Sequence, residues 1–473
     1  MKKRAFALSL MFVVLLFSCG CSQRKTEIIH DDHFVFGQDY QYQFGSSWYK
    51  NHINKSDKGY YFTLSDFLFY LDESTMQATP LCDRPNCVHE MITQSSALPE
   101  CNACIGAADG EIYYYDGTVY YMKTYMNTAG SDNERETRII RCSSDGTSKD
   151  ILASVKNSQN NCMIVHRGYV YYSATEYVLT SERDSRGKTK INGLTTLYRL
   201  DLSDSNAKPE SYLQNADFGL SGVPIIRKLS AYGDHLIIYA EESDLYSENG
   251  ISVTVENNPI YSVDLNTKRL TDLTKICCPQ ADSRLEDVTY LNGKIMFRLA
   301  KNDVLSREVY TMNFDGTDIQ SVFSLTDGVI ASFYTDENYV YSYSLRYDPS
   351  GKCEGLTLDV YDDSFHLLNT VMLPLPDPFA EGDGMLSSCG DKLMAYGVTY
   401  RLDENGEPVN EKCPVHYIKY INKSELLQKN SKPEWKLAYD SEYRYENIYG
   451  YRHKTATPKI YEFSPNYETV NDV

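Results

Sequence analysis

The chain alternates apolar and polar residues in short runs that end at tight polar turns. Residues 112–124 read IYYYDGTVYYMKT, and residues 288–300 read VTYLNGKIMFRLA. The Asp-Gly and Asn-Gly dipeptides between the runs tolerate the positive φ angles of a two-residue hairpin turn. Alternation with a period of two is typical of half-buried strands. Each of these stretches therefore predicts a β-hairpin.

The hairpin is the first half of a unit that recurs along the chain. Further copies start at Met163, Leu229, Ala331 and Leu386. Two more strands follow the hairpin, starting at Thr137, Thr196, Pro259, Glu308 and Thr357, with a weaker first copy at Gly59 and a divergent last one at Val415. Four strands in about 40 to 55 residues is the period of a propeller blade. The sequence predicts an all-β protein, a β-propeller of about seven four-stranded blades over residues 34–440.

A propeller ring has to close, because one blade cannot bury both faces of its sheet. Closure by a strand from the far end of the chain would also remove exposed sheet edges. FVFGQDYQYQF at 34–44 and KIYEF at 459–463 are the two candidate closing strands.

Long polar insertions fall at one place in the unit, between its second and third strands. They cover 124–136, 181–193, 242–257, 347–355 and 401–412. In a four-stranded meander this is the same end of every blade, so the insertions should share one face of the disc. In repeat proteins such a face commonly carries the binding site. The alternative is that these are surface loops whose sequence and length vary without any function.

The amino terminus predicts export and a lipid anchor. A cationic start, an apolar run and small residues are typical of a secretory signal, here 1–18. Leu16-Phe17-Ser18-Cys19 resembles a lipobox, so Cys19 is the predicted lipidation site and Cys21 the alternative. Residues 19–33 would then link the anchor to the propeller, and 441–473 form a Tyr-rich tail. We expect a protein anchored to the cell membrane on its extracytoplasmic face.

Composition narrows the set of partners. The chain has 41 Tyr and 2 Trp, which suits strand faces where a ring packs and its hydroxyl reaches water. Its net charge is −19, and loss of the signal leaves 43 Lys and Arg against 65 Asp and Glu, or −22. Such a chain is repelled by nucleic acid. A small molecule, a glycan or an envelope protein remains as the partner.

A cluster of cysteines lies ahead of the first strong hairpin, in LCDRPNCVH at 81–89 and CNAC at 101–104. Cys82, Cys87, His89 and Cys101 supply the three sulfurs and one imidazole of a structural zinc site, and Cys104 is a further thiol. Pro85 and Asn86 favour a tight turn between the first two cysteines. A disulfide among the same cysteines and a functional thiol remain as alternatives.

These elements together resemble a family of β-propeller lipoproteins from Gram-positive anaerobes. The shared pattern is a Leu-Cys, Pro-x-Cys-x-His, Cys-Asn-Ala element near the first blade. It matches Cys82, Pro85, Cys87, His89, Cys101, Asn102 and Ala103, whereas Cys104 and the spacer 90–100 depart from it. The resemblance implies a β-propeller fold and an extracytoplasmic location, but it implies no enzymatic activity.

No catalytic motif stands out in the sequence. It has no Gly-x-Ser-x-Gly elbow, no His-Glu-x-x-His and no phosphate-binding glycine loop. We expect a non-catalytic propeller that binds a ligand or protein partner through its loop face. The alternative is a glycan-active hydrolase or lyase with paired carboxylates at the channel mouth, and a third reading is an envelope scaffold.

Overall fold

The fold is described from a computed structural model of the chain. The structure describes residues 33–41, 53–64, 67–85, 87, 100–105, 112–127, 134–156, 158, 162–183, 187–220, 222–247, 251–280, 282–302, 304–325, 329–350, 353–374, 385–387, 390–400 and 414–442. The predicted signal, Cys19, Cys21, His89 and the tail beyond 442 lie outside these residues.

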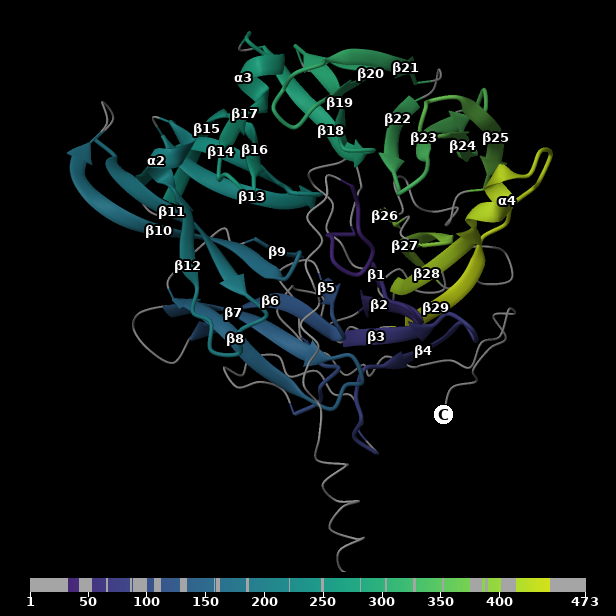
Figure 1. Cartoon of the computed structure of the whole chain (residues 1–473), viewed down its shortest axis with the longest axis horizontal. Coiled ribbons are helices and arrows are strands. Elements are labelled where there is room, and N and C mark those ends of the chain that lie inside the picture. Colours follow the sequence, from purple (N-terminus) through teal and green to yellow (C-terminus); the bar gives the residue numbers. More distant parts are fainter. Residues whose placement is uncertain are drawn as a thin grey trace, which may run out of the picture.

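The molecule is a ring of seven antiparallel blades (Figure 1). Each blade has four strands from one continuous stretch of the sequence, with the first strand nearest the centre. The prediction of about seven four-stranded blades is therefore confirmed. Blade 4 carries one extra strand, β15.

The strands follow the predicted units. Blades 1 and 2 contain β1 (Ile53–Lys55), β2 (Gly59–Leu64), β3 (Phe67–Asp72), β4 (Gln77–Pro80), β5 (Ile112–Tyr115), β6 (Thr118–Asn127), β7 (Glu134–Ser143) and β8 (Lys149–Lys156). Blades 3 and 4 contain β9 (Met163–His166), β10 (Tyr169–Arg183), β11 (Thr189–Asp201), β12 (Glu210–Gln214), β13 (Val223–Tyr232), β14 (His235–Ser247), β15 (Ile251–Asn257), β16 (Ile260–Asp264) and β17 (Leu270–Asp272). Blades 5 to 7 contain β18 (Ser283–Leu291), β19 (Lys294–Lys301), β20 (Val304–Met312), β21 (Gln320–Ser324), β22 (Val329–Thr335), β23 (Val340–Tyr347), β24 (Cys353–Tyr361), β25 (Leu367–Leu373), β26 (Met385–Ser387), β27 (Lys392–Tyr400), β28 (Pro414–Asn422) and β29 (Lys436–Glu442).

The described residues include three short helices that follow strands at the rim: α2 (Asn215–Phe218), α3 (Leu273–Cys277) and α4 (Lys423–Leu427). Within the described part of the chain, no helix has the length and apolar character needed to cross a bilayer.

The inner hairpin turns adopt the backbone that the dipeptides predict. Asp116 and Gly117 have φ angles of 45° and 74°, and Asn292 and Gly293 have 48° and 69°. These values belong to a two-residue turn whose twist matches the flanking strands. Here "inner hairpin turns" means the turns that join the first two strands of each blade.

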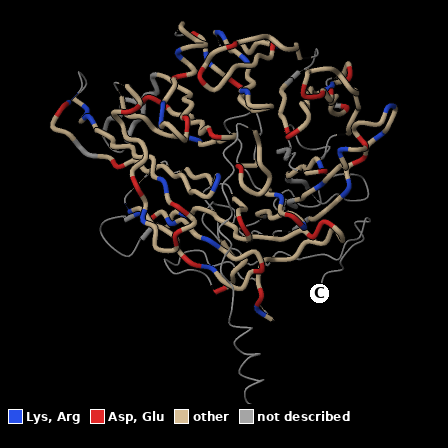
Figure 2. Tube along the Cα trace, viewed as in Figure 1, with Lys and Arg blue, Asp and Glu red and all other residues tan. Residues whose placement is uncertain are grey.

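Tyrosine and aliphatic side chains fill the space between blades. Tyr61, Tyr121 and Ile140 pack together between blades 1 and 2, and Tyr232, Phe297 and others pack between blades 4 and 5. Among the described residues, nine tyrosines are almost wholly buried, namely Tyr40, Tyr60, Tyr121, Tyr171, Tyr261, Tyr290, Tyr334, Tyr341 and Tyr417. Charged residues of both signs are spread around every part of the ring (Figure 2), so the acidity of the chain is distributed surface charge.

Where the structure describes them, the predicted insertions are extensions of regular hairpins; 401–412 lies outside the described residues. β10 and β11 remain paired as far as Arg183 and Thr189, and β6 and β7 as far as Asn127 and Glu134. The extended ends of blades 3 and 4 also pair with each other, because Ile191 of β11 lies opposite Leu245 of β14. This ladder joins the two blades into one nine-stranded sheet.

The described part of the amino-terminal segment is not a strand. Residues 34–41 of the candidate closing strand 34–44 form turns, and every blade is complete without them. We call residues 33–41 the strap, which lies at the centre of the ring (Figure 1). The candidate is therefore not a strand over its described part, and the other candidate, 459–463, lies outside the described residues.

The strap is held by polar contacts to the inner hairpin turns. Arg167 of blade 3 donates from Nε to Asp39 Oδ1 over 2.6 Å and from Nη1 to Asp234 of blade 4. The Tyr40 N–H donates to Nδ1 of fully buried His166 over 3.1 Å. Gln41 exchanges two hydrogen bonds with the Lys55 backbone of blade 1, at 2.7 and 2.8 Å. The strap therefore braces blades 1, 3 and 4 from inside.

Candidate metal centre

The cysteine loop begins where the outermost strand of blade 1 ends. After β4, the Leu81 N–H donates to the Leu68 carbonyl over 2.9 Å, which holds the chain against β3. The Cys87 N–H then donates to the Arg84 carbonyl over 3.3 Å. This bond closes the tight turn that Pro85 and Asn86 predict, and it turns the chain back between Cys82 and Cys87.

The second part of the loop, 101–104, completes the outer edge of blade 1. The Leu68 N–H donates to the Ala103 carbonyl over 2.8 Å, and Cys104 forms an antiparallel bridge with Phe67. The Cys104 N–H donates to the Cys101 carbonyl over 3.1 Å, so the segment is a turn. These bonds place Cys101 beside the first two cysteines.

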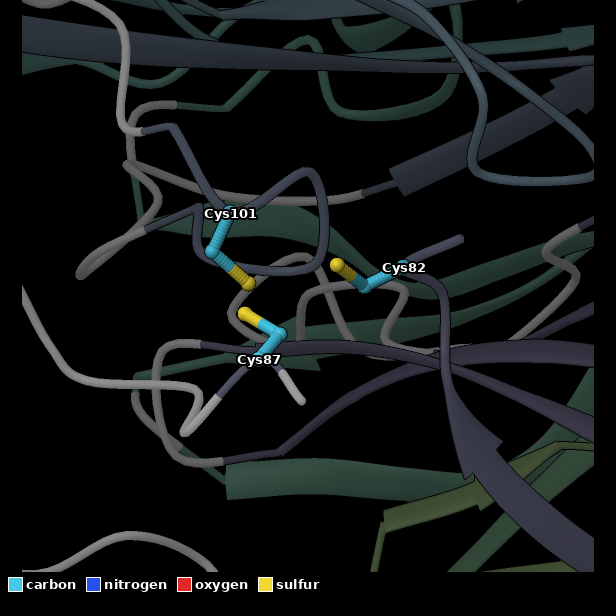
Figure 3. A group of neighbouring side chains, drawn as sticks. All are labelled: Cys82, Cys87 and Cys101. Atoms are coloured by element: carbon cyan, nitrogen blue, oxygen red, sulfur yellow. The ribbon is translucent and has the colours of Figure 1, made fainter. Parts of the chain in front are cut away.

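Three thiols converge at this point (Figure 3). The sulfur atoms of Cys82, Cys87 and Cys101 all lie within 4.8 Å of one another and point toward a common centre. Cys101 is 7% exposed, whereas Cys82 and Cys87 are half-buried. Three of the four predicted ligands thus come together, and the fourth, His89, lies outside the described residues.

Cys104 is not part of this group. Its side chain is fully buried and packs in the cluster that contains Phe67, Phe69 and Tyr439. Among the described residues, Cys104 therefore belongs to the packing between blades 7 and 1. Its sulfur is absent from the group of three thiols.

The surroundings act differently on two of the thiols. Burial raises the pKa of the Cys101 thiol to about 12. Burial also acts to raise the pKa of Cys82, but hydrogen bonds from the backbone of Arg84 and Asn102 outweigh it and lower that pKa below the ordinary value. Because metals bind thiolates, the surroundings of Cys82 favour the form that binds a metal more than those of Cys101 do.

Blade 2 supports the loop from the other side. The half-buried Lys149 Nζ donates to the Cys101 and Cys104 carbonyls over 2.8 and 3.0 Å, and burial lowers the pKa of this amine. Asn102 Nδ2 donates to the Gly146 carbonyl over 2.6 Å. A Cβ on Gly146 would meet the Leu81 carbonyl carbon and oxygen at 2.8 Å, so the β7–β8 turn packs directly on the start of the loop.

The donor set fits a tetrahedral metal ion. Zinc lies about 2.3 Å from a thiolate sulfur, which places tetrahedral sulfurs about 3.8 Å apart. The three sulfurs already lie within 4.8 Å, so small rotations of their side chains suffice. The three thiols can therefore hold a metal ion. The same proximity allows any two of them to form the alternative disulfide.

Other cysteines of the sequence serve elsewhere in the described structure. Cys142 is fully buried in the core between blades 1 and 2, as a strand cysteine is expected to be. Cys277 and Cys278 lie at the end of α3, and burial raises their pKa values to about 12 and 11. These inert thiols are useful controls for the cluster.

Carboxylates near the inner hairpin turns are bound to cations. Arg167 neutralises Asp39 and Asp234, Lys423 pairs with Asp336, and Lys392 pairs with Glu73 over 3.3 Å. Sequence reasoning missed these pairs, because the partners lie on different blades up to 319 residues apart. The long separations leave no local signal in the sequence.

Comparison with known proteins gives the fold alone. No protein-family model matches the sequence, and no curated protein sequence matches it. Solved structures match at low identity. An oligogalacturonate lyase from Vibrio parahaemolyticus has a TM-score of 0.39 and 9% identity over 75% of this chain and 87% of its own. A GH74 xyloglucanase from Xanthomonas campestris has a TM-score of 0.41 and 10% identity over 86% of this chain and 55% of its own.

A third match is the β-propeller domain of the Trilobed protease from Pyrococcus furiosus, described as having an open velcro topology. Its TM-score is 0.34, with 11% identity over 68% of this chain and 94% of its own. What these proteins act on remains a property of those proteins. The chain itself is a seven-bladed β-propeller with a three-thiol site on its first blade.

Proposed function

We propose that this chain is a lipid-anchored extracytoplasmic propeller that binds a partner through its insertion face and carries a structural zinc ion in its cysteine loop. The insertion face is the end of the ring that bears the turns between the second and third strands. The carrying observation is that the second strands of blades 2, 3 and 4, which end at this face, have 10, 15 and 13 residues, against 6 in blade 1 and 8 in blade 5.

The length and order of these hairpins support a binding role. Paired strands such as β10 and β11 hold their shape without a ligand, so a partner need not order them on binding. The ladder between β11 and β14 fixes two of the hairpins to each other. A rigid, raised platform of this kind favours recognition with little rearrangement.

The buried carboxylates favour binding over glycan cleavage. A glycosidase needs two carboxyl groups about 5 to 10 Å apart, one of them available as an acid. Near the inner hairpin turns, the described carboxylates Asp234, Glu73 and Asp336 pair with Arg167, Lys392 and Lys423. These ion pairs suit rigid structure, although burial raises the pKa of Glu337, next to Asp336.

Photo-crosslinking on intact cells tests the binding face. A photoreactive residue at exposed Glu182, near the tip of the blade 3 hairpin, should give a discrete crosslinked product. The same residue at exposed Ser203, in the turn at the other end of β11, is the matched control and should give none. A crosslinked product from Ser203 alone would show that the insertion face is not the binding face. A product of the same size from both sites would show that the partner does not bind the insertion face specifically.

Zinc is the metal that the donors favour, because soft thiolates with one imidazole select it. The sequence supplies His89, two residues after Cys87, as the fourth ligand. Purified mature protein should contain about one equivalent of zinc. Cys82→Ser, Cys87→Ser and Cys101→Ser should each lose most of it, whereas Cys278→Ser should retain it.

Thiol counting separates the alternatives for this site. A metal site releases reactive thiols when zinc is chelated, and a disulfide releases them only after reduction. Metal-free protein with two protected cysteines that appear only on reduction would establish the disulfide in place of zinc.

A further inference from the structure

The strap fixes where the amino-terminal chain leaves the ring. Arg167 Nη2 donates to the His33 carbonyl over 2.9 Å, and His33 itself is exposed. The next residue, Phe34, packs with the cluster that contains Tyr232. At the other end of the strap, Gln41 binds Lys55 at the end of β1. Every one of these contacts is made by an inner hairpin turn or the strand end beside it.

Inner hairpin turns and insertions lie at opposite ends of the blades. The second strand of each blade starts at the inner turn and ends at the insertion. In blade 6, β23 has 8 residues, or about 26 Å at about 3.3 Å per residue. In blade 3, β10 has 15 residues, or about 50 Å. The insertion tips therefore stand tens of ångströms from the strap.

The covalent tether between the predicted anchor and the strap is short. Fourteen peptide units separate Cys19 from His33. A random coil of this length would have a root-mean-square span of roughly 20 Å, less than the length of the 15-residue β10. An anchor at Cys19 would thus keep the strap end of the ring near the bilayer on average.

We infer that the propeller faces the bilayer with its inner-hairpin end and presents the insertion face away from it. The partner on the near side is a lipid surface, and the far side is left open to ligands in the surrounding space. This orientation rests on the proposed lipid anchor and adds a direction to the proposed binding face.

Energy transfer to the membrane surface tests the orientation. Full-length lipidated protein would be placed in phosphatidylcholine vesicles that carry an acceptor-labelled lipid. A fluorescent amino acid would be introduced at Asn338 or at Ser350, two exposed positions at the two ends of β23. Transfer should be several-fold more efficient from Asn338 than from Ser350. Equal transfer, or stronger transfer from Ser350, would overturn the orientation.

Two further measurements separate this inference from the anchor on which it rests. Mass spectrometry of the same samples shows whether the amino-terminal cysteine carries lipid, and flotation shows whether the protein binds vesicles. Protein without lipid that fails to float would overturn the anchor and the orientation together. Lipidated, floating protein with the wrong order of transfer would overturn the orientation alone. Matching melting temperatures for both labelled proteins confirm that the label leaves the fold intact.

Discussion

At the scale of single residues, an aspartate recurs in the turn between the third and fourth strands. Asp72, Asp145 and Asp315 each accept hydrogen bonds from the backbone N–H and the hydroxyl of a Ser or Thr two residues on. The sequence contains this signal, Asp followed by Ser or Thr at the second position, in five of the seven such turns, those of blades 1, 2, 3, 5 and 6. This is the Asx turn, and it could be predicted because all its partners are local.

The hydrogen bonds to Asp145 should make the stability of the fold depend on pH. Hydrogen bonds from Ser143 and Thr147 lower the pKa of Asp145 below its ordinary 3.8. A lowered pKa in the folded state means that the ionised side chain adds stability above about pH 4, and that this stability is lost as the pH falls through the lowered value. Wild type should therefore be more stable than Asp145→Asn at pH 7.

The difference between these two proteins should shrink as the pH falls through the lowered pKa of Asp145, because both side chains are then neutral. Urea unfolding at several pH values measures it. Asp57→Asn, in the exposed β1–β2 turn, removes the same charge outside such a turn. A gap between wild type and Asp145→Asn that does not change with pH would contradict the account.

Gly146 permits a close approach that no other residue allows. Its φ is 72°, and a Cβ there would lie 2.8 Å from the Leu81 backbone. Gly187 has a similar φ of 81°, but nothing lies within 4 Å of its Cβ position. Backbone strain alone costs about 1 kcal/mol for alanine at either site.

Gly146→Ala should therefore lower the free energy of unfolding by about 2 to 3 kcal/mol, against about 1 kcal/mol for Gly187→Ala. It should also weaken metal binding, because the displaced Leu81 is followed directly by Cys82. Thermal unfolding and zinc content measure the two effects. Equal losses from both substitutions would show that the turn does not press on the cysteine loop.

At the scale of elements, hairpins were predictable and the strap was not. A hairpin is encoded by alternation and by a turn dipeptide that are both local. The strap depends on buried Asp39 and Gln41, whose partners lie in blades 3 and 1. Its aromatic residues alternate like a strand, so the sequence pattern favoured the wrong element. In the cysteine loop, likewise, residue types indicated the site, but only the fold separates Cys101 from Cys104.

Arg167 is the residue on which the strap depends most. It is 3% exposed and holds two carboxylates, Asp39 and Asp234. Arg167→Met leaves both charges buried without their cation, which should cost about 3 to 5 kcal/mol of unfolding free energy. Arg141→Met breaks the exposed pair with Asp150 and should cost less than about 1 kcal/mol.

Neutralising the two carboxylates provides the internal check on this prediction. The triple variant Arg167→Met, Asp39→Asn, Asp234→Asn should recover part of the loss, because no uncompensated charge remains. Denaturant unfolding of the three variants gives these energies. A loss for Arg167→Met no larger than that for Arg141→Met would mean that the strap contributes little.

At the scale of the whole molecule, neighbouring blades are joined in two different ways. Blades 3 and 4 share backbone hydrogen bonds through β11 and β14. Blades 7 and 1 meet through side chains, with Lys392 near Glu73 and Tyr439 packed 4.9 Å from the Phe69 ring centre. Salt screens the ion pair between Lys392 and Glu73, but it leaves the backbone hydrogen bonds between β11 and β14 intact.

Hydrogen exchange should reveal this difference. Raising NaCl to about 1 M should speed exchange by up to about fivefold at Asn54 of β1 and Leu393 of β27, since a partly exposed ion pair contributes up to about 1 kcal/mol. Exchange at Lys190 and Ile191 in the ladder should not change. Glu73→Gln at low salt should reproduce the effect of salt. Faster exchange in the ladder would contradict this description of the ring.

The ladder between blades 3 and 4 also bears on how such a chain can change over generations. Repeat proteins gain and lose units by duplication, which requires each unit to separate cleanly from its neighbour. A new unit inserted between β12 and β13 would part Ile191 from Leu245 and leave two unpaired strand edges. A unit added at the junction of the first and last blades would break only replaceable side-chain contacts. Relatives with six or eight blades should therefore differ at that junction and keep the third and fourth units together.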